Sequence, residues 1–502
     1  MTVLDRVLAG ELPGEAALIE YVRGRRWFGA KAQEVAHAQL LETAVLQSEP
    51  PALVAAVAEI RFPPGTHELY QLPLGLRRAS DGWRTGVVAE VDGWVIYDAL
   101  SDPELARVLA ELVRGDVTAS AREGVLEFRS TDVAFDGLPS PRPLGSEQSN
   151  TSVIFGEELI MKAYRRLEAG VNPELELLRF LTERRFKNVA DLAGWYAYAG
   201  AVMDLTLGIL QRFVVSGEDG WELGLAELRT APGRFLERLG RLGEVTGSMH
   251  AVLSSESADP DFAPEEPSGE ALALLVATVD EEIEAVFLEL PENEPALAPI
   301  AGRGEEVRER LRAISRVGDV GRIIRTHGDY HLGQVLLTTG ADQKGDVRGA
   351  EIQDVGALPG RPSEVTGRHD RSERADGTDW VVLDFEGEPA RSLPERRRKR
   401  SPLRDVAGML RSFAYAASAS ELVNGVRPPE GWEEEARRRF LDGYLATVDR
   451  HVLPGSPTGM ERLLAVFELE KAVYELRYEL NNRPDWVGIP VAGIQRLLEQ
   501  PL

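Results

Sequence analysis

The chain has 502 residues, which is long for one hydrophobic core, so we expect two or three packed units. Its 82 acidic and 57 basic residues give a formal net charge of −25, which argues against nonspecific binding to nucleic acid or to an anionic membrane. Cysteine is absent, which excludes disulfides, thiolate zinc sites and a cysteine nucleophile.

Targeting signals are not expected. The N-terminal stretch has acidic residues where a secretory signal needs an apolar core. No run of 18 apolar residues occurs, so no membrane span is expected. These observations favour a cytoplasmic protein.

Residues 1–98 are expected to form a small α+β unit. The apolar runs at 52–62 and 68–76 flank a Pro-Pro-Gly turn, which is typical of a hairpin. The stretch 87–100 carries Asp-Gly between two β-rich runs, a strong hairpin signal. We therefore predict paired strands in this first subdomain.

Residues 99–215 mix helix and strand patterns. Asn172 and Pro173 suit the cap and the first position of a helix at 172–186. The stretch 201–214 is interpreted as paired strands. Further strands are expected at 125–130, 152–156 and 159–164.

Residues 216–502 are predicted to be mostly helical. The helix at 460–482 has an apolar stripe at steps of three and four residues, which indicates one buried face. One segment, 339–378, is rich in Gly, Asp and Arg. It cannot bury enough apolar area to offset its ordering entropy, so we predict a disordered insertion.

The stretch IRTHGDYHLGQ raises a choice between a metal site and a catalytic loop. His327 and His331 would be zinc ligands in the first case, but no third ligand is spaced nearby. In the second case Asp329 is the functional group. A buried strand at 380–383 ends at Asp384, and without the insertion it would form a hairpin with the stretch after Asp329.

Phosphoryl transfer needs this combination of groups. One carboxylate must lie near the attacking hydroxyl, and oxygen ligands must hold Mg²⁺ against the nucleotide phosphates. Asp329 suits the first role. Gln334 and Asp384 suit the second.

The loop resembles that of the aminoglycoside phosphotransferases within the protein kinase-like superfamily. Their catalytic loop reads H-G-D-x-x-x-x-N, and here it runs from His327 through Asp329 to Gln334. Gln replaces the usual Asn but keeps the amide oxygen. The resemblance assigns Asp329 as the catalytic base and Gln334 and Asp384 as metal ligands, with Glu386 as a further ligand.

The resemblance also implies a nucleotide site upstream. Lys162, in a strand pattern, would contact the ATP phosphates, and a helix carboxylate would pair with it. Glu174 and Glu176 both fit by position, and Glu176 is the choice by analogy. A phosphate loop is expected at 145–153, and adenine contacts at the hinge-like strand 209–214. The assigned residues are Ser146, Ser149 and Asn150 for phosphate, and Gln211 and Phe213 for adenine.

Several motifs together resemble the maltokinase family over nearly the whole chain. They are RRWFGAK, GDYHLGQVL, DFEGEP, SPLRDVAGMLRSFAYAA and ELEKAVYELRYELNNRPDWVGIP. The resemblance implies a bilobal α+β kinase-like fold with an N-terminal cap (1–98), an intermediate subdomain (99–215) and a helical C-lobe (216–502). It also implies an ATP- and Mg²⁺-dependent enzyme that phosphorylates the anomeric hydroxyl of maltose, feeds glycogen synthesis and associates with trehalose synthase.

The sugar site is expected on the helix at 460–482 and the turn after it. Sugar sites combine aromatic faces with charged or amide groups, and Tyr474 and Tyr478 lie one turn apart on the same helix face. The candidate sugar contacts are His331, Lys471, Tyr474, Glu475, Tyr478, Glu479, Arg483 and Trp486.

Two alternatives stay open at this stage. Glucosamine kinases share the scaffold, so glucosamine is the second candidate substrate. A pseudokinase that serves as a scaffold for a trehalose or glucan enzyme is the non-enzymatic alternative. The presence of Lys162, Asp329, Gln334 and Asp384 argues against the pseudokinase.

Overall fold

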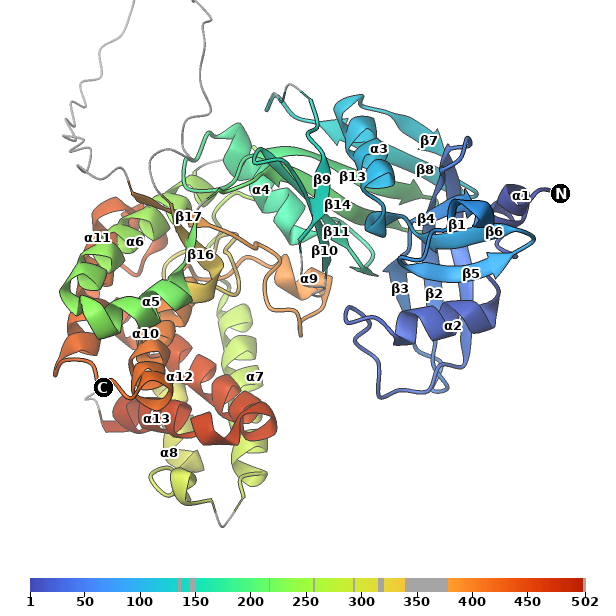
Figure 1. Cartoon of the computed structure of the whole chain (residues 1–502). Helices are drawn as coiled ribbons and strands as arrows, with labels where there is room; N and C mark the ends of the chain where they lie inside the picture. Colours follow the sequence, from blue (N-terminus) through green and yellow to red (C-terminus); the bar gives the residue numbers. More distant parts are fainter. Residues whose placement is uncertain are drawn as a thin grey trace, which may run out of the picture.

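The structure is a computed structural model of the whole chain, and three regions follow one another along it (Figure 1). A blue N-terminal sheet lies at one end, a cyan-to-green sheet lies in the middle, and a helical lobe lies at the other end. The structure describes residues 1–133, 135, 137–144, 150–215, 217–255, 258–291, 294–314, 320–338 and 378–499. The predicted insertion at 339–378 therefore lies, except for Thr378, outside the described residues.

The first region is an antiparallel sheet backed by two short helices. The Asp92-Gly93 turn, with both residues at positive φ, joins two neighbouring strands as the sequence predicts. The strands are β1 (His37–Gln47), β2 (Ala52–Arg61), β3 (His67–Gln71), β4 (Leu74–Arg78), β5 (Val87–Val91), β6 (Trp94–Asp98) and β12 (Arg166–Leu167), and the helices are α1 (Val3–Leu8) and α2 (Glu15–Arg23).

The run 68–76 is two strands rather than the predicted one. Pro73 has no N–H to donate within a ladder, so β3 ends at Gln71 and β4 begins at Leu74. Both strands pair with β2, at opposite ends of it. The fold of the first region thus depends on β2 as its central strand.

A buried polar network joins this first region to the middle sheet. Arg165, directly after β11 (Leu159–Tyr164), donates to Asp98 at 2.6 Å, and both side chains are at most 5% exposed. Gln71 donates to the carbonyls of Tyr164 and Leu207. The strand β12 also pairs with β3, so the two sheets are joined by backbone as well as by side chains.

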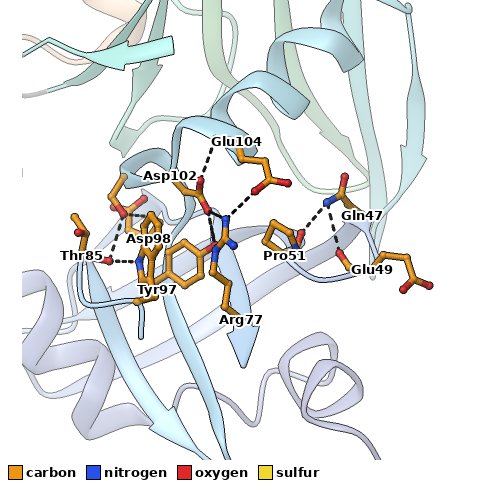
Figure 2. Close-up of polar contacts among 11 residues, drawn as sticks. Gln47, Glu49, Pro51, Arg77, Thr85, Tyr97, Asp98, Asp102 and Glu104 are labelled. Carbon is orange, nitrogen blue, oxygen red and sulfur yellow. Dashed lines mark hydrogen bonds and ion pairs between the residues drawn. The ribbon is translucent and has the colours of Figure 1, made fainter. Parts of the chain in front are cut away.

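Arg77 makes a second polar cluster where the first region meets helix α3 (Pro103–Arg114). Figure 2 shows its guanidinium between Asp102 and Glu104, at 2.8 and 2.9 Å from their carboxylates. Asp102 also accepts from the Tyr97 hydroxyl and caps α3. The cluster fixes the start of this helix against the sheet.

The middle region is a seven-stranded antiparallel sheet with the order β7-β8-β13-β14-β11-β10-β9. Helix α4 (Pro173–Glu183) begins with Asn172 as its cap and Pro173 at its first position, as predicted. The strands are β7 (Thr118–Ser120), β8 (Gly124–Ser130), β9 (Pro141–Pro143), β10 (Asn150–Phe155), β11 (Leu159–Tyr164), β13 (Leu192–Gly200) and β14 (Asp204–Arg212).

The prediction of paired strands within 201–214 is wrong. This stretch forms the single strand β14, and its partner β13 lies upstream at Leu192–Gly200. Small residues hid β13, because its sequence LAGWYAYAG lacks the β-branched side chains that mark strands.

The third region is mostly helical, and its core includes α6, α10, α11 and α12. Helix α12 (Pro457–Asn482) buries Val466, Leu469, Val473 and Leu476, which confirms the predicted stripe. The other helices are α5 (Gly220–Thr230), α6 (Pro232–Leu253), α7 (Gly269–Leu288), α8 (Gly304–Ile314), α9 (Leu393–Arg396), α10 (Leu403–Asn424), α11 (Trp432–Thr447) and α13 (Gly488–Glu499). No described helix is long and apolar enough to cross a membrane.

A small sheet supports the loops that follow its strands. Strands β16 (Val335–Thr338) and β17 (Asp379–Val382) pair antiparallel, and β15 (Glu218–Asp219) pairs with β16. This is the hairpin that the sequence predicts once the insertion is set aside. It places the stretch before β16 next to the stretch after β17.

Helices α6 and α11 approach so closely that only glycine fits at their crossing. A Cβ on Gly243 would overlap the carbonyl of Phe440, whereas a Cβ on Gly240 would lie 3.7 Å from the carbonyl of Arg439. Replacing glycine by alanine inside a helix normally stabilises it by about 1 kcal/mol. Gly243→Ala should instead lower the free energy of unfolding, since overpacking costs about 1–3 kcal/mol.

Chemical unfolding of both variants tests this packing. Gly240→Ala is the matched control and should be neutral or slightly stabilising. Equal stability of the two variants would contradict the close approach of α6 and α11.

Candidate active site

The THGD stretch forms a tight loop before the 3-10 turn η4 (Leu332–Gln334). Gly328 has a φ of +88°, which favours glycine. The Nε2 atom of His327 lies 2.8 Å from the Leu383 carbonyl, and a carbonyl only accepts, so Nε2 carries the proton. His327 therefore joins the catalytic loop to the end of β17 and binds no metal in this arrangement.

Asp405, on α10, holds the backbone of this loop. Its carboxylate accepts from the N–H groups of His327 and Gly328 at 2.8 and 3.0 Å, and from His250 Nε2 at 3.1 Å. Burial alone would raise the pKa of Asp405, but these hydrogen bonds and the nearby imidazoles lower it below its ordinary value. Arg404, the residue before it in the sequence, has a different partner.

Arg404 instead pairs with Glu470 on α12 at 2.5 Å. Neighbouring side chains on a helix point about 100° apart, so they rarely meet. Asp405 is thus a loop-positioning residue that the sequence analysis missed.

Lys162, on β11, lies among three carboxylates. Its Nζ atom is 2.8 Å from Glu174, 2.8 Å from Asp384 and 2.6 Å from Glu386. Burial would lower the pKa of Lys162, but the three carboxylates outweigh burial and raise it well above its ordinary value. Lys162 is therefore a permanent cation that joins the middle sheet to the loop after β17.

The predicted partner of Lys162, Glu176, is corrected to Glu174. Both glutamates lie in the first turns of α4, but only Glu174 faces β11. Glu176 is buried against Arg325 and Arg397, at 2.7 Å from each. Two residues differ by about 200° around a helix, so the two carboxylates face opposite sides.

The three carboxylates around Lys162 fit a magnesium site. Oxygen atoms of Glu174, Asp384 and Glu386 lie within 4.8 Å of one another, and Lys162 neutralises only one of the three charges. Carboxylate oxygens are the ligands that Mg²⁺ prefers. Asp384 also has a positive φ of +60°, which is uncommon outside glycine and frequent at functional positions.

Gln334 lies beside this cluster, as expected for a metal ligand. Its Nε2 donates to Asp384 at 3.3 Å. A half-turn of the amide would present its oxygen to a cation held by Asp384. Glu386 accepts from Asn150 of β10 at 2.6 Å, so one predicted phosphate contact already meets one predicted metal ligand.

Of the other predicted nucleotide contacts, two lie outside the described residues and two lie in or just after β14. Ser146 and Ser149 lie outside the described residues. Gln211 is half-buried in β14, between β11 and β13. The N–H of Phe213 donates to the carbonyl of Glu158 at 2.8 Å, so this group is not available to adenine in this structure. Adenine binding at 209–214 stays a prediction.

A cavity of about 260 Å³ opens beside Asp329. Lys471, on α12, reaches its wall and lies 3.2 Å from Asp329 and 3.5 Å from Glu388. These carboxylates outweigh burial and raise the pKa of Lys471 above its ordinary value. The charged lining residues are Glu282, Asp329, Glu388, Glu395, Asp405, Glu470, Arg391, Arg396, Arg400, Arg404, Lys471 and Arg477.

Only two of the predicted sugar contacts line this cavity, namely Lys471 and Tyr474. The six others, none of which lines it, are His331, Glu475, Tyr478, Glu479, Arg483 and Trp486.

Most of these six have other contacts. Glu475 pairs with the buried Arg411 at 2.7 Å. Arg483 pairs with Glu479 and lies over the rings of Tyr478 and Trp486. The helix turns these positions away from the cavity, which the sequence analysis did not take into account.

His331 also has a structural role. Its Nδ1 accepts from the Gly333 N–H at 3.1 Å and so caps η4. Burial, the largest influence, lowers its pKa, so the imidazole is neutral. Because Nδ1 accepts this N–H, the proton of the neutral ring lies on Nε2, so neither nitrogen offers a free lone pair to zinc in this arrangement.

Most of the cavity wall consists of residues that the sequence motifs did not indicate. Glu388 lies two residues after Glu386, and Phe467 and Glu470 lie one turn before Lys471 and Tyr474 on α12. A search at steps of three and four from Tyr474 would have found the α12 residues. Nothing in the sequence signalled Glu282 of α7, which comes from a distant segment.

Comparisons with known proteins agree with this geometry. A family model described as the maltokinase N-terminal cap domain matches residues 21–102. The glucosamine kinase of Streptacidiphilus jiangxiensis is 25% identical over 447 residues, covering 86% of this chain and 89% of the relative. That of Mycolicibacterium smegmatis is 24% identical over 378 residues, covering 72% of this chain and 80% of the relative.

A solved structure gives the same fold. Glucosamine kinase in complex with glucosamine, ADP and inorganic phosphate superposes with a TM-score of 0.66 at 20% identity. The match covers 95% of this chain and 98% of that one. The chain is therefore similar to sugar kinases over most of its length, and its N-terminal region matches the model of a maltokinase cap domain. The chain has the bilobal α+β fold that the sequence motifs imply.

The role of Asp329 can be tested by Asp329→Asn. The variant keeps the size of the side chain but cannot accept the proton of the sugar hydroxyl, so turnover should fall about 10²–10⁴-fold. ATP affinity, measured by calorimetry, should stay within a few-fold of wild type. Asp442→Asn, an exposed change on α11, is the control. Turnover near the wild-type rate in Asp329→Asn would contradict the assignment.

The position of the sugar site can be tested with two tyrosines of α12. Tyr474 lines the cavity, whereas Tyr478 is 46% exposed and lies outside the lining. Tyr474→Ala should raise the KM for sugar and leave the KM for ATP unchanged. Tyr478→Ala is the matched control and should change neither constant. A larger increase of the KM for sugar in Tyr478→Ala than in Tyr474→Ala would place the sugar site at the C-terminal end of α12.

Proposed function

We propose that this kinase transfers the γ-phosphoryl group of ATP to the anomeric hydroxyl of maltose, giving maltose 1-phosphate and ADP. The observation that carries the proposal is the lining of the cavity beside Asp329. Six carboxylates and six cationic side chains line it, so its formal charge is zero. Sugar hydroxyls both donate and accept, and such a mixed lining offers them partners of both kinds.

Each group of the site has a role in this reaction. Asp329 orients the sugar hydroxyl and accepts its proton. Lys471 contacts Asp329 at 3.2 Å and keeps a positive charge beside the reacting oxygen. Lys162 contacts the phosphates of ATP and is positioned by Glu174 at 2.8 Å. Phosphoryl transfer depends mainly on this positioning and on charge stabilisation.

Mg²⁺ fits the same proposal. Asp384, Glu386 and the amide oxygen of Gln334 would hold it, and it would neutralise charge on the β- and γ-phosphates. Closure around the sugar would exclude water, which otherwise competes for the phosphoryl group.

The maltokinase-type cap and the α12 motif support maltose as the acceptor. The proposal includes a use for the product, which would be a substrate for glycogen synthesis. It also includes association with trehalose synthase and a cytoplasmic location.

Glucosamine is the second candidate acceptor. It is favoured by the names of the relatives and by Glu282, a half-buried lining carboxylate for which the described residues show no ion pair. An ammonium group on the sugar would pair with such a carboxylate. The overall balance of charge in the lining favours the neutral disaccharide instead.

A direct comparison of the two sugars separates these candidates. ADP release measured with maltose and with glucosamine should give a kcat/KM at least about tenfold higher for maltose, a difference of about 1.4 kcal/mol. Transfer to the anomeric hydroxyl should also abolish the reducing end of the product, which a reducing-sugar assay detects. A preference for glucosamine would overturn the choice of acceptor, and a reducing product would overturn the position of transfer.

A further inference from the structure

The basic run ERRRKR at 395–400 does not lie free on the surface. Arg396, the last residue of α9, donates to Glu168 at 2.5 Å and to the backbone carbonyl of Glu386 at 3.1 Å. Arg397 follows it and binds Glu176 of α4. Figure 1 shows α9 between the sheet that carries β10 and β11 and the helical lobe. The run therefore connects the two lobes next to the site.

Three side chains form what we name the Glu176 cluster, namely Glu176, Arg325 and Arg397. Arg397 binds Glu176 with two hydrogen bonds, from Nε at 3.0 Å and from NH2 at 2.7 Å. Arg325 donates to Glu176 at 2.7 Å and is 2% exposed. Burial would raise the pKa of Glu176, but the two guanidinium groups outweigh burial and lower it. The lowered pKa favours the charged carboxylate, which both guanidinium groups bind.

Each member of the cluster comes from a different part of the site. Arg325 lies two residues before His327 of the catalytic loop, and Arg397 lies in the segment that follows the metal ligands. Glu176 lies two residues after Glu174, which pairs with Lys162. The cluster therefore joins α4 to the catalytic loop and to the segment after Asp384.

A second contact holds α4 against the helical lobe. Phe180, one turn after Glu176, stacks on Phe262 with ring centroids 3.7 Å apart. Arg325 lies over the Phe262 ring at 5.5 Å. The helix that carries Glu174 is thus docked on the helical lobe by an aromatic pair and a buried ion pair.

We propose that the Glu176 cluster sets the position of α4, so that Glu174 holds Lys162 in place for the ATP phosphates. Arg397 and Arg325 are positioning residues, since they act through Glu176 and touch no reacting atom. This inference rests on the proposed kinase activity but does not depend on which sugar is the acceptor. Removing Arg397 leaves the buried Glu176 with Arg325 as its remaining partner, and the carboxylate oxygen that Arg397 held loses its donor. Helix α4 then shifts to find water or another donor for that oxygen.

Arg397→Gln and its neighbour Arg398→Gln form a matched pair for the test. Both changes remove one positive charge from α9 and its flank, but Arg398 is exposed and Arg397 binds Glu176. Calorimetry without sugar should show ATP affinity about tenfold weaker in Arg397→Gln, within the range of coupling energies between connected sites. Arg398→Gln should bind ATP as wild type does. Unchanged ATP affinity in Arg397→Gln would overturn the proposal.

A double-mutant cycle with Lys162→Met distinguishes positioning from general loss of structure. If the cluster acts through Lys162, then Arg397→Gln weakens ATP binding in wild type but causes no further loss in the Lys162→Met background. An equal loss in both backgrounds would overturn the proposal. If Arg397→Gln fails to fold, Arg397→Lys replaces it in the same cycle, with the same two outcomes. Because sugar is absent, failure of the maltose proposal would not alter either result.

Discussion

One lysine ammonium shared by carboxylates from two lobes determines the arrangement of this site. Lys162 of the middle sheet meets Glu174 of α4 on one side and Asp384 and Glu386 of the loop after β17 on the other. A buried ammonium is costly unless it is paired, so β11, α4 and that loop must come together. The excess of negative charge then suits a divalent cation and the nucleotide phosphates that it accompanies.

Charged side chains hold the loops around this lysine. Some bind the backbone of a loop, and others connect one element to another. Asp405 fixes the N–H groups of His327 and Gly328, and Arg396 binds the carbonyl of Glu386. Glu176 joins α4 to the segments on either side. Such contacts place catalytic groups on rigid supports, which is what positioning chemistry requires.

The cap is joined to this machinery through the strand that carries Lys162. Arg165 follows β11 and binds Asp98 at the end of the cap sheet, and Gln71 binds the neighbouring carbonyl of Tyr164. These contacts are buried and polar, so they are specific in direction as well as in distance. The cap therefore supports the strand that carries Lys162 and is not an appended module.

Local patterns made much of this molecule predictable. The Asp92-Gly93 turn, the cap of α4, the stripe of α12 and the β16–β17 hairpin follow from turn, capping and periodicity rules. Spacing without the insertion also predicted that the stretch before β16 lies next to the stretch after β17. Predictions failed where two residues lay close in sequence but faced different ways, as with Glu174 and Glu176 or with Tyr474 and Glu475.

The sequence by itself determined which chemical groups are present and on which elements they lie. Only the tertiary structure decided which of them meet. Helix rotation turned Glu176 and Glu475 toward arginines and left Glu174 and Tyr474 for the site. The partners of these glutamates, Arg325, Arg397 and Arg411, come from distant segments. Long-range packing selects the face of each helix that points to the site, and no local sequence pattern encodes that packing.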